Sequence, residues 1–520
     1  MKRTQRFLAL FATIICIGTI AHAQSGNPAA LTTVGAVDYR QTPFAATTDC
    51  RALAAPLTED VEIRSVRLVD AVGGVPAHCR VDGVIAPEIG FQINLPIQWN
   101  GRLYMFGNGG FAGEDVDAPA MKASRDAGIA NGFAVARTDT GHLAAIEPGG
   151  SFARNPGKMV DHAYLAVHKT VQYAKSAISA FYGRAADYSY WQGCSTGGRQ
   201  GVMSAQRYPD DFDGIAAAAP TLDWNNIMVK GLWTRQSFAG AGLTVAKMET
   251  VFAAVKRKCD AIDGLVDGLI DDPRRCQFDA ARDVRACKAG SDGADCLTSR
   301  QSQALNHFYG GPRDAQGRAY FHPQSVGAEP VSTFAPFAMM SDGSEGYLPK
   351  MADSWMANMV FANAQYDPAN FNFSRDPALG NSVSEIMNPT PDLDRFHALG
   401  GKMITYWGWS DTALNPQMGI SYYDKLSRRY GIDELQAFYR LFLIPGVAHC
   451  AGGYGPSSID ALTPVIDWVE KGIAPARLAT HSPPGSAKPY SRSYCPYPTR
   501  TIYRGRGDTE DSENFECVEQ

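Results

Sequence analysis

Short apolar segments alternate with segments of helical periodicity through the first 220 residues of the chain. Predicted strands lie at residues 103–106, 133–137, 188–192 and 214–219, and predicted helices at 161–182 and 197–208. The predicted helix at 161–182 has apolar residues at helical spacing, among them Ala163, Val167, Val171 and Ala174. Strands that alternate with helices favour an α/β protein with a mainly parallel sheet covered on both faces.

The pattern changes in the middle of the chain. Residues 223–385 contain four cysteines, aromatic clusters and only weak strand periodicity. Strand patterns return at 402–407 and 438–444. We therefore predict a catalytic domain formed by residues 24–222 and 386–520, with residues 223–385 inserted as a lid domain.

The first 23 residues have the pattern of a secretory signal peptide. Lys2, Arg3 and Arg6 precede the apolar run at 7–20, and Ala21-His22-Ala23 is a small-x-small cleavage site. The run is too short to span a bilayer, and no later segment is long and apolar enough. Cys16 follows Ile15, which disfavours a lipoprotein signal. We expect a secreted or periplasmic protein without a membrane partner.

Without Cys16, ten cysteines remain, and an even number in an exported protein suggests five disulfides. Sequence alone allows many connectivities. Nearness in sequence favours Cys50–Cys79, Cys259–Cys276, Cys287–Cys296 and Cys495–Cys517. Cys194 and Cys450 then remain, either bonded to each other or as buried free thiols.

The charge of the chain argues against a nucleic-acid partner. The formal net charge is −5, and the sequence has no basic stripe or arginine-rich run. The hydrophobic content of 45% is that of an ordinary globular protein.

Three residues that follow predicted strands form a candidate catalytic triad. Ser195 lies in Gly193-Cys194-Ser195-Thr196-Gly197, between a predicted strand and a predicted helix. This is the nucleophile elbow of an α/β-hydrolase fold, in which Ser, Asp and His follow one another along the chain. Asp411 and His449 follow the strands at 402–407 and 438–444.

Each candidate has a plainer interpretation. Ser195 could be a turn serine, His449 a core histidine, and Asp411 a helix cap, with Asp392 or Asp394 as the acid instead. His142, His162 and His168 favour structural roles. A disulfide between Cys194 and Cys450 would place Ser195 and His449 within hydrogen-bond reach, because it holds its Cα atoms about 5.5–6 Å apart.

An oxyanion hole needs backbone N–H groups that face the developing negative charge. Thr196, directly after the nucleophile, is the first candidate donor. The second is expected in Gly107-Asn108-Gly109-Gly110, where Gly110 is favoured over Gly109. The alternative is a tight turn without substrate contact.

The segment 259–269 is acidic and contains two glycines, and the cysteines Cys259 and Cys276 flank it. Its oxygen donors suit Ca²⁺. An EF-hand that starts at Asp263 fails, because Leu265 and Arg274 would occupy ligand positions. The predicted ligands are the Asp260, Asp263 and Asp267 side chains and the Leu265 and Leu269 carbonyls. The alternative is a solvated acidic turn.

These residues resemble the tannase and feruloyl esterase family of serine esterases, over nearly the whole mature chain. The resemblance lies in Cys194-Ser195 with His449-Cys450, in the Gly-Trp-Ser-Asp411 segment, in Gly-Asn-Gly-Gly-Phe111 and in the loop at 260–269. It implies a Cys194–Cys450 disulfide beside the triad, five bridges in the pairing favoured above, and a structural calcium ion in the lid.

The resemblance also implies a function. It predicts hydrolysis of aromatic acid esters by a Ser195 acyl-enzyme, with small aromatic esters as substrates. The candidates for an acyl pocket in the lid are Trp233, Trp355, Phe361 and Tyr366, although residues of this kind are more often part of the core. No carboxylate-binding arginine can be matched to this sequence, which favours hydroxycinnamic or gallic esters over mono(2-hydroxyethyl) terephthalate. Other hypotheses are an exported serine peptidase of the same fold and a non-catalytic cell-wall binding protein.

Overall fold

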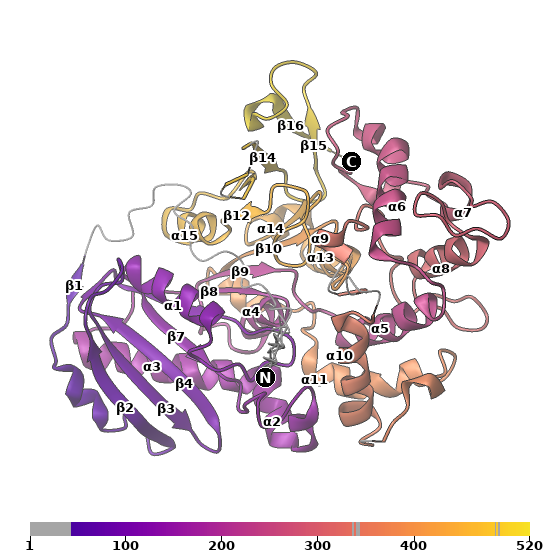
Figure 1. The fold of residues 1–520 in the computed structure, drawn as a ribbon. Helices are drawn as coiled ribbons and strands as arrows, with labels where there is room; N and C mark the ends of the chain where they lie inside the picture. The colour runs from indigo at the N-terminus through magenta and orange to yellow at the C-terminus, as the bar shows by residue number, and fades with distance from the viewer. Residues whose placement is uncertain are drawn as a thin grey trace, which may run out of the picture.

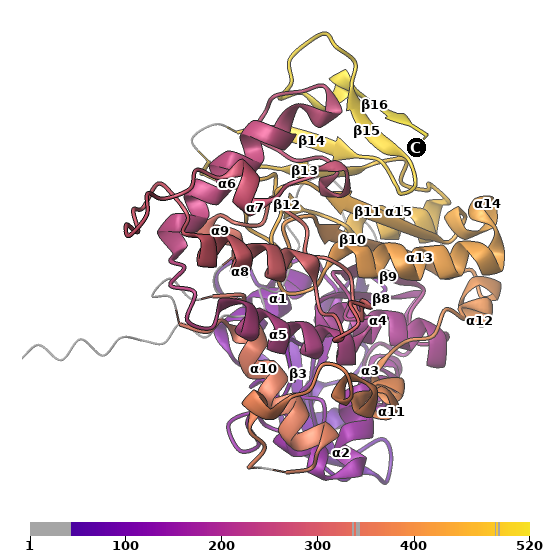
Figure 2. The same cartoon turned by 90° about the vertical axis from the view of Figure 1, so that its right-hand side faces the viewer.

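Figures 1 and 2 show a computed structural model of the chain in two views. The structure describes residues 43–334, 337–339, 344–363, 365–483, 485–486 and 489–519. The predicted signal peptide at 1–23 lies outside these residues. Within them, no helix combines the length and apolar character needed to cross a membrane.

A nine-stranded sheet forms the centre of the described chain, in the order β11-β10-β9-β8-β6-β7-β4-β3-β2. The strands from β6 to β11 are parallel, and β2, β3 and β4 extend the sheet in antiparallel register. Their bounds are β2 (Val61–Val69), β3 (His78–Ile85), β4 (Ile89–Pro96), β6 (Arg102–Phe106), β7 (Ala134–Thr138), β8 (Tyr188–Cys194), β9 (Gly214–Ala218), β10 (Lys402–Gly408) and β11 (Tyr439–Ile444). All six predicted strands are present, and the predicted α/β class is confirmed.

The parallel strands are apolar on both faces because helices cover them. In β10 every residue from Met403 to Gly408 is buried, whereas exposed positions recur along the edge strand β2. Helices packed on the sheet are α1 (Pro119–Ala130), α3 (Ala166–Tyr182), α4 (Thr196–Arg207), α13 (Pro416–Tyr430), α14 (Ile432–Gln436) and α15 (Leu462–Lys471). The predicted helix at 161–182 begins with a π-helical turn, Asp161–Leu165, that continues into α3.

The segment between β9 and β10 is helical and lies on the right of the molecule in Figure 1. The α-helices that begin before residue 386 are α5 (Trp224–Phe238), α6 (Val245–Cys259), α7 (Ala280–Asp283), α8 (Ser299–Gly310), α9 (Val331–Phe334), α10 (Tyr347–Trp355) and α11 (Asn381–Met387). Part of it has a hydrophobic core of its own, which includes Met248, Val251, Leu305 and Phe308. We call residues 223–385 the lid; its bounds as a domain stay a prediction.

Short elements complete the described fold. They are β1 (Phe44–Ala45), β5 (Gln98–Trp99), α2 (Pro156–Val160), α12 (Asp394–Ala398), β12 (Ser458–Ile459), β13 (Leu478–His481), β14 (Ser491–Tyr494), β15 (Arg500–Tyr503) and β16 (Phe515–Val518). The C-terminal strands β14, β15 and β16 lie near α6 of the lid in both views.

Five disulfides are present among the described residues, and they are the five predicted pairs. They join Cys50–Cys79, Cys194–Cys450, Cys259–Cys276, Cys287–Cys296 and Cys495–Cys517. Cys194–Cys450 alone links β8 to the loop after β11, across 256 residues.

Candidate active site

Ser195 lies at the sharp turn between β8 and α4. Its φ of 63° and ψ of −122° are a strained conformation for a residue with a side chain. The turn is fixed on both sides, since the Ser195 N–H donates to the Ala218 carbonyl at 3.0 Å and the Ser195 carbonyl accepts from Thr221 N–H. This is the geometry expected of the nucleophile elbow.

The glycines around Ser195 are required by close backbone contacts. A Cβ atom on Gly193 would lie 2.5 Å from the Gly197 carbonyl carbon, and one on Gly198 would lie 2.5 Å from the Ala218 oxygen. A side chain at either position would therefore push the elbow out of place.

Asp411 and His449 are hydrogen-bonded to each other. His449 Nδ1 lies 2.7 Å from Asp411 Oδ2, and the Asp411 side chain is fully buried. The other carboxylate oxygen accepts the N–H groups of Ala413 and Leu414, at 2.8 and 2.7 Å. The alternative acid Asp394 instead pairs with Arg429 and Tyr430. The structure therefore places Asp411, and not Asp394, beside the histidine.

The Cys194–Cys450 disulfide brings Ser195 and His449 to one site. Its Cα atoms are 5.9 Å apart, and one His449 ring nitrogen lies within 4.8 Å of both sulfur atoms. Ser195 and His449 line the same pocket.

The two predicted oxyanion donors lie side by side. The Thr196 hydroxyl donates to the Gly110 carbonyl at 2.6 Å. In the part of the chain that the structure describes, neither the Gly110 N–H nor the Thr196 N–H has a hydrogen-bond partner. The Gly109 N–H, by contrast, donates to Glu114 Oε1 at 2.6 Å. Of the two glycines considered, only Gly110 can therefore offer its N–H to a ligand.

Side chains that sequence analysis did not single out fix the loop from Gly107 to Ala118. Asn108 exchanges two hydrogen bonds with Gln200 of α4, at 3.0 and 3.1 Å. Glu114 Oε2 accepts from the Asn108 amide and pairs with the buried Arg137 of β7. The loop is thus fixed to both the nucleophile helix and the sheet before any substrate arrives.

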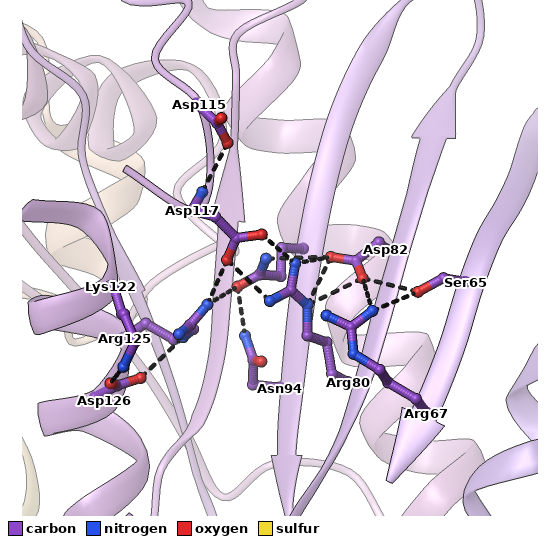
Figure 3. Close-up of polar contacts among 11 residues, drawn as sticks. Ser65, Arg67, Arg80, Asp82, Asn94, Asp115, Asp117, Lys122, Arg125 and Asp126 are labelled. Carbon is purple, nitrogen blue, oxygen red and sulfur yellow. Dashed lines mark hydrogen bonds and ion pairs between the residues drawn. The ribbon is translucent and has the colours of Figure 1, made fainter. Parts of the chain in front are cut away.

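The end of the same loop is fixed to the antiparallel strands by an ion-pair network (Figure 3). Arg80 of β3 lies between Asp82 and Asp117, and binds Asp117 through both terminal nitrogens at 2.9 and 2.6 Å. Arg125 of α1 reaches Asp117 from the other side, at 2.8 Å. Asp117 therefore fixes the point at which the loop enters α1.

The pocket beside Ser195 and His449 is apolar and lies under the lid. Its lid-side walls come from Ile227 and Met228 of α5, from Leu348 and Met351 of α10, and from three aromatic residues, Trp224, Phe337 and Tyr347. Ala413 and Leu414 of the acid loop complete it. Within the described residues, no Lys, Arg, Asp or Glu lines this pocket.

The four aromatic residues considered from sequence for this pocket lie elsewhere, in line with the alternative that they are core residues. Trp233, Trp355, Phe361 and Tyr366 do not line it; Trp355 packs behind Trp224, with ring centroids 6.0 Å apart. Sequence gave little signal for the true lining, because its residues come from separate helices and loops. The spacing of Trp224, Ile227 and Met228 on one helical face was the available clue.

The three histidines near the sheet are buried or bonded away from the pocket. His168 binds Asp211 and stacks on Tyr208. His142 and His162 are buried, with ring centroids 6.1 Å apart, and neither ring has a hydrogen-bond partner among the described residues. Burial lowers the pKa of His142 to about 4 and that of His162 well below its usual value.

The acidic loop at 259–269 collects carboxyl groups with little opposing charge. Burial raises the pKa of Asp263, and the neighbouring Asp267 and Asp260 raise it further. Asp271, which sequence analysis did not include, is half-buried, and desolvation together with the charge of Asp263 raises its pKa to about 7. Arg492 of β14 is the cation paired to Asp267, at 3.1 Å.

The loop's donors are oxygens, which fit a hard cation. Their side chains presently bind backbone N–H groups: Asp260 accepts from Asp267 and Gly268, and Asp263 from Leu265. No three carboxyl groups of this loop bring an oxygen each within 4.8 Å of one another in the described chain. The donor chemistry and the mutual repulsion fit a cation, while the present side-chain positions do not form a closed cage.

Comparison with protein-family models matches residues 72–518 to "Tannase and feruloyl esterase". An uncharacterized esterase of Xanthomonas campestris is 33% identical over 94% of both chains. Mono(2-hydroxyethyl) terephthalate hydrolase of Piscinibacter sakaiensis is 31% identical over 86% of both chains. A probable feruloyl esterase B-1 of Aspergillus oryzae is 32% identical, over 86% of this chain and 85% of its own.

Solved structures of esterases have the same fold as this chain. Feruloyl esterase B of Aspergillus oryzae has a TM-score of 0.78 and 29% identity, and the match covers 90% of this chain and 99% of that one. Tannin acyl hydrolase of Aspergillus niger, at 21% identity, matches with a TM-score of 0.73 over 89% and 92% of the chains. The α/β-hydrolase fold predicted from the elbow is thereby confirmed.

Proposed function

The chain belongs to the tannase and feruloyl esterase family of carboxylic ester hydrolases, and we propose that it hydrolyses esters of aromatic acids through a Ser195–His449–Asp411 triad. The observation that carries the proposal is the Asp411–His449 pair, joined by a disulfide to a strained serine beside two unbonded N–H groups.

In the proposed reaction, Ser195 Oγ attacks the ester carbonyl carbon while His449 accepts the hydroxyl proton. Asp411 orients the imidazole through Nδ1 and stabilises its protonated form. The tetrahedral oxyanion is bound by the Gly110 and Thr196 N–H groups. His449 then protonates the leaving alcohol, and water hydrolyses the acyl-enzyme by the same steps.

The pocket supports an uncharged aromatic acyl group. Trp224, Phe337 and Tyr347 offer ring surface, and the Thr221 and Tyr347 hydroxyls offer polar contacts for ring substituents. A free carboxylate on the acyl ring would lose its water shell there without a cationic partner, which is costly. Hydroxycinnamic or gallic esters therefore suit the pocket better than a terephthalate monoester.

Initial rates on methyl ferulate, methyl gallate and mono(2-hydroxyethyl) terephthalate test this proposal, with Ser195→Ala as control. We expect turnover of the first two to exceed that of the third, and Ser195→Ala to abolish each. Activity retained by Ser195→Ala would refute the triad, and no turnover on any aromatic ester would refute the substrate class.

Mono(2-hydroxyethyl) terephthalate hydrolysis is the second candidate function. The 31% identity to the Piscinibacter sakaiensis enzyme supports it. A clear preference for the terephthalate ester would establish it over the first candidate, and would require a cation to reach the acyl ring when substrate binds.

We further propose that the lid loop binds a structural Ca²⁺, with the Asp260, Asp263 and Asp267 side chains and the Leu265 and Leu269 carbonyls as ligands. The ion would neutralise carboxyl groups that now oppose one another. Metal analysis of protein dialysed against trace calcium should find about one ion per chain, and Asp263→Asn should lose it. Absence of calcium from both proteins would contradict the proposal.

Export is also proposed. The signal-like segment at 1–23 and the five disulfides support it. Expression of the full chain in a bacterial host, followed by N-terminal sequencing, should find Gln24 as the first residue of exported protein. An uncleaved chain in the cytoplasm would contradict it.

A further inference from the structure

Three of the hydrogen bonds between the lid and the loop that carries Asp411 are made at Asp411 itself and at Thr412. Gln324 Nε2 lies 3.4 Å from the Asp411 carbonyl, and the Thr412 hydroxyl donates to the Thr333 carbonyl at 2.8 Å. The third comes from Lys230 of α5, whose Nζ donates to the Thr412 carbonyl at 2.9 Å.

Lys230 is a charged side chain in a buried position. It is only 3% exposed, and the bond to Thr412 is its one side-chain hydrogen bond in the described chain. A buried ammonium group without a nearby anion is strongly unfavourable. Burial lowers the pKa of Lys230 to about 8, and the negative charge of Asp411 acts in the opposite direction. The lysine thus remains mainly protonated at neutral pH.

Among the described residues, Asp411 is the acidic group whose charge raises the pKa of Lys230. The other buried acid near this loop is Glu329, which accepts from Tyr309 and from the Gly327 N–H. Burial raises the pKa of Glu329 to about 7. Glu329 is present in the wild type and in every variant described below. A difference in pH dependence between these proteins therefore reports on Lys230 and not on Glu329.

The position of Lys230 along α5 links the acid loop to the substrate pocket. Trp224, Ile227 and Met228 line the pocket from this helix, and Lys230 lies half a turn beyond Met228. Ala413 and Leu414, directly after the carbonyl that Lys230 binds, line the same pocket. One lid helix therefore contacts both the pocket and the catalytic acid loop.

We propose that Lys230 is a positioning residue for the catalytic acid, which fixes the Asp411 loop through Thr412 and stabilises the Asp411 carboxylate by its charge. This inference rests on the proposed triad. It assigns to the lid a part in catalysis that is separate from substrate recognition. It also explains why a buried lysine points away from solvent and toward the triad.

The test is the pH dependence of kcat/KM on a small aryl ester for Lys230→Met, Lys230→Gln and Lys230→Arg. Without the cation, the Asp411–His449 pair takes up a proton more readily. We expect the acidic limb to move up by about half a pH unit or more in the Met and Gln variants. Their kcat at pH 7 should fall about tenfold, with KM little changed. Arg should retain the wild-type limb.

Lys247→Met is the matched control. Lys247 is an equally buried lysine of the lid, bound to Asp292 and to the carbonyls of Gly293 and Cys296, away from the triad. Its loss should lower thermal stability without moving the acidic limb. The Lys230→Gln variant keeps a hydrogen-bond donor for the Thr412 carbonyl, so it remains informative if Lys230→Met does not fold.

An unchanged limb in a folded Lys230→Gln or Lys230→Met protein would overturn the proposal, as would an equal shift in Lys247→Met. Failure of the triad itself gives a different result. In that case Ser195→Ala keeps its activity, whatever the lysine variants do.

Discussion

Two carboxylates near the proposed reaction centre, Asp411 and Glu114, each bind loop backbone with one oxygen and side chains with the other. Asp411 binds two backbone N–H groups with Oδ1 and His449 with Oδ2. Glu114 binds the Gly109 N–H with Oε1, and Asn108 and Arg137 with Oε2. A single residue thereby fixes the backbone and a functional side chain together.

Glu114→Gln should weaken the oxyanion hole. The amide keeps one acceptor but places an NH₂ group against N–H or guanidinium donors, so the Gly109–Gly110 turn loses one of its anchors. We expect kcat to fall about tenfold with KM nearly unchanged, because the lost contact acts on the transition state. Steady-state kinetics on methyl ferulate measures this. Glu88→Gln, at an exposed carboxylate paired with Lys158, should leave both constants unchanged.

His142 should make the protein sensitive to acid. Its folded-state pKa of about 4 lies below the ordinary value of 6.5, so the unfolded chain binds the proton more readily. The corresponding stability is complete above about pH 6.5 and is lost as the pH falls toward 4. The loss amounts to about 2 kcal/mol at pH 5.

Urea denaturation at pH 8 and pH 5 measures this effect. His142→Asn should show a smaller drop between the two pH values than the wild type, even if it is less stable at pH 8. His481→Asn in β13 should retain the wild-type drop. Equal pH dependence in all three proteins would contradict the role of His142.

Single residues differ in how far sequence could identify them. Ser195, Asp411 and His449 could be singled out as candidates because each follows a strand, in the order expected for a triad on this fold. Glu114, Lys230 and Tyr347 could not, because their neighbours are distant in sequence and only the packed lid and loop bring them together. Burial, which makes Lys230 notable, has no local signature in a sequence.

Among the secondary-structure elements, the buried parallel strands were predictable and the antiparallel extension was not. Every parallel strand is a short apolar run that ends at a turn. β3, in contrast, contains Arg80 and Asp82, charges that interrupt such a pattern. They are tolerated because Arg80 pairs with Asp82 and with Asp117 of the β6–α1 loop, and Arg125 of α1 binds Asp117 in turn (Figure 3).

Removal of the Cys194–Cys450 disulfide should cost more stability than removal of Cys287–Cys296. Chain-entropy estimates give about 5 kcal/mol for the long loop and about 3 kcal/mol for the short one. The double variants Cys194→Ser/Cys450→Ser and Cys287→Ser/Cys296→Ser test this by thermal melting. Esterase activity should fall at least tenfold in Cys194→Ser/Cys450→Ser and not in Cys287→Ser/Cys296→Ser, because only the first pair joins the segments that carry Ser195 and His449. Equal loss of activity in both would contradict this assignment.

For the whole molecule, the acidic loop is a junction between the lid and the C-terminal strands. Arg492 of β14 binds Asp267 of the lid at 3.1 Å and the Thr509 carbonyl at 3.0 Å. Arg492 is 7% exposed and the Asp267 side chain is 13% exposed, so the pair is largely buried. Because breaking one side of a buried pair leaves a charge uncompensated, Arg492→Met should lower the Tm by about 3 °C or more.

Added calcium should restore part of the Tm that the Arg492→Met variant loses. Without Arg492, the loop has one opposing cation fewer, so a bound ion relieves more repulsion than it does in the wild type. Melting curves with calcium and with a chelator should therefore show a larger calcium-dependent rise in Tm for Arg492→Met than for the wild type. Arg504→Met, at the more exposed pair with Glu516, should behave as the wild type. A calcium effect that is equal in all three proteins would mean that Arg492 and the ion do not share the Asp267 site.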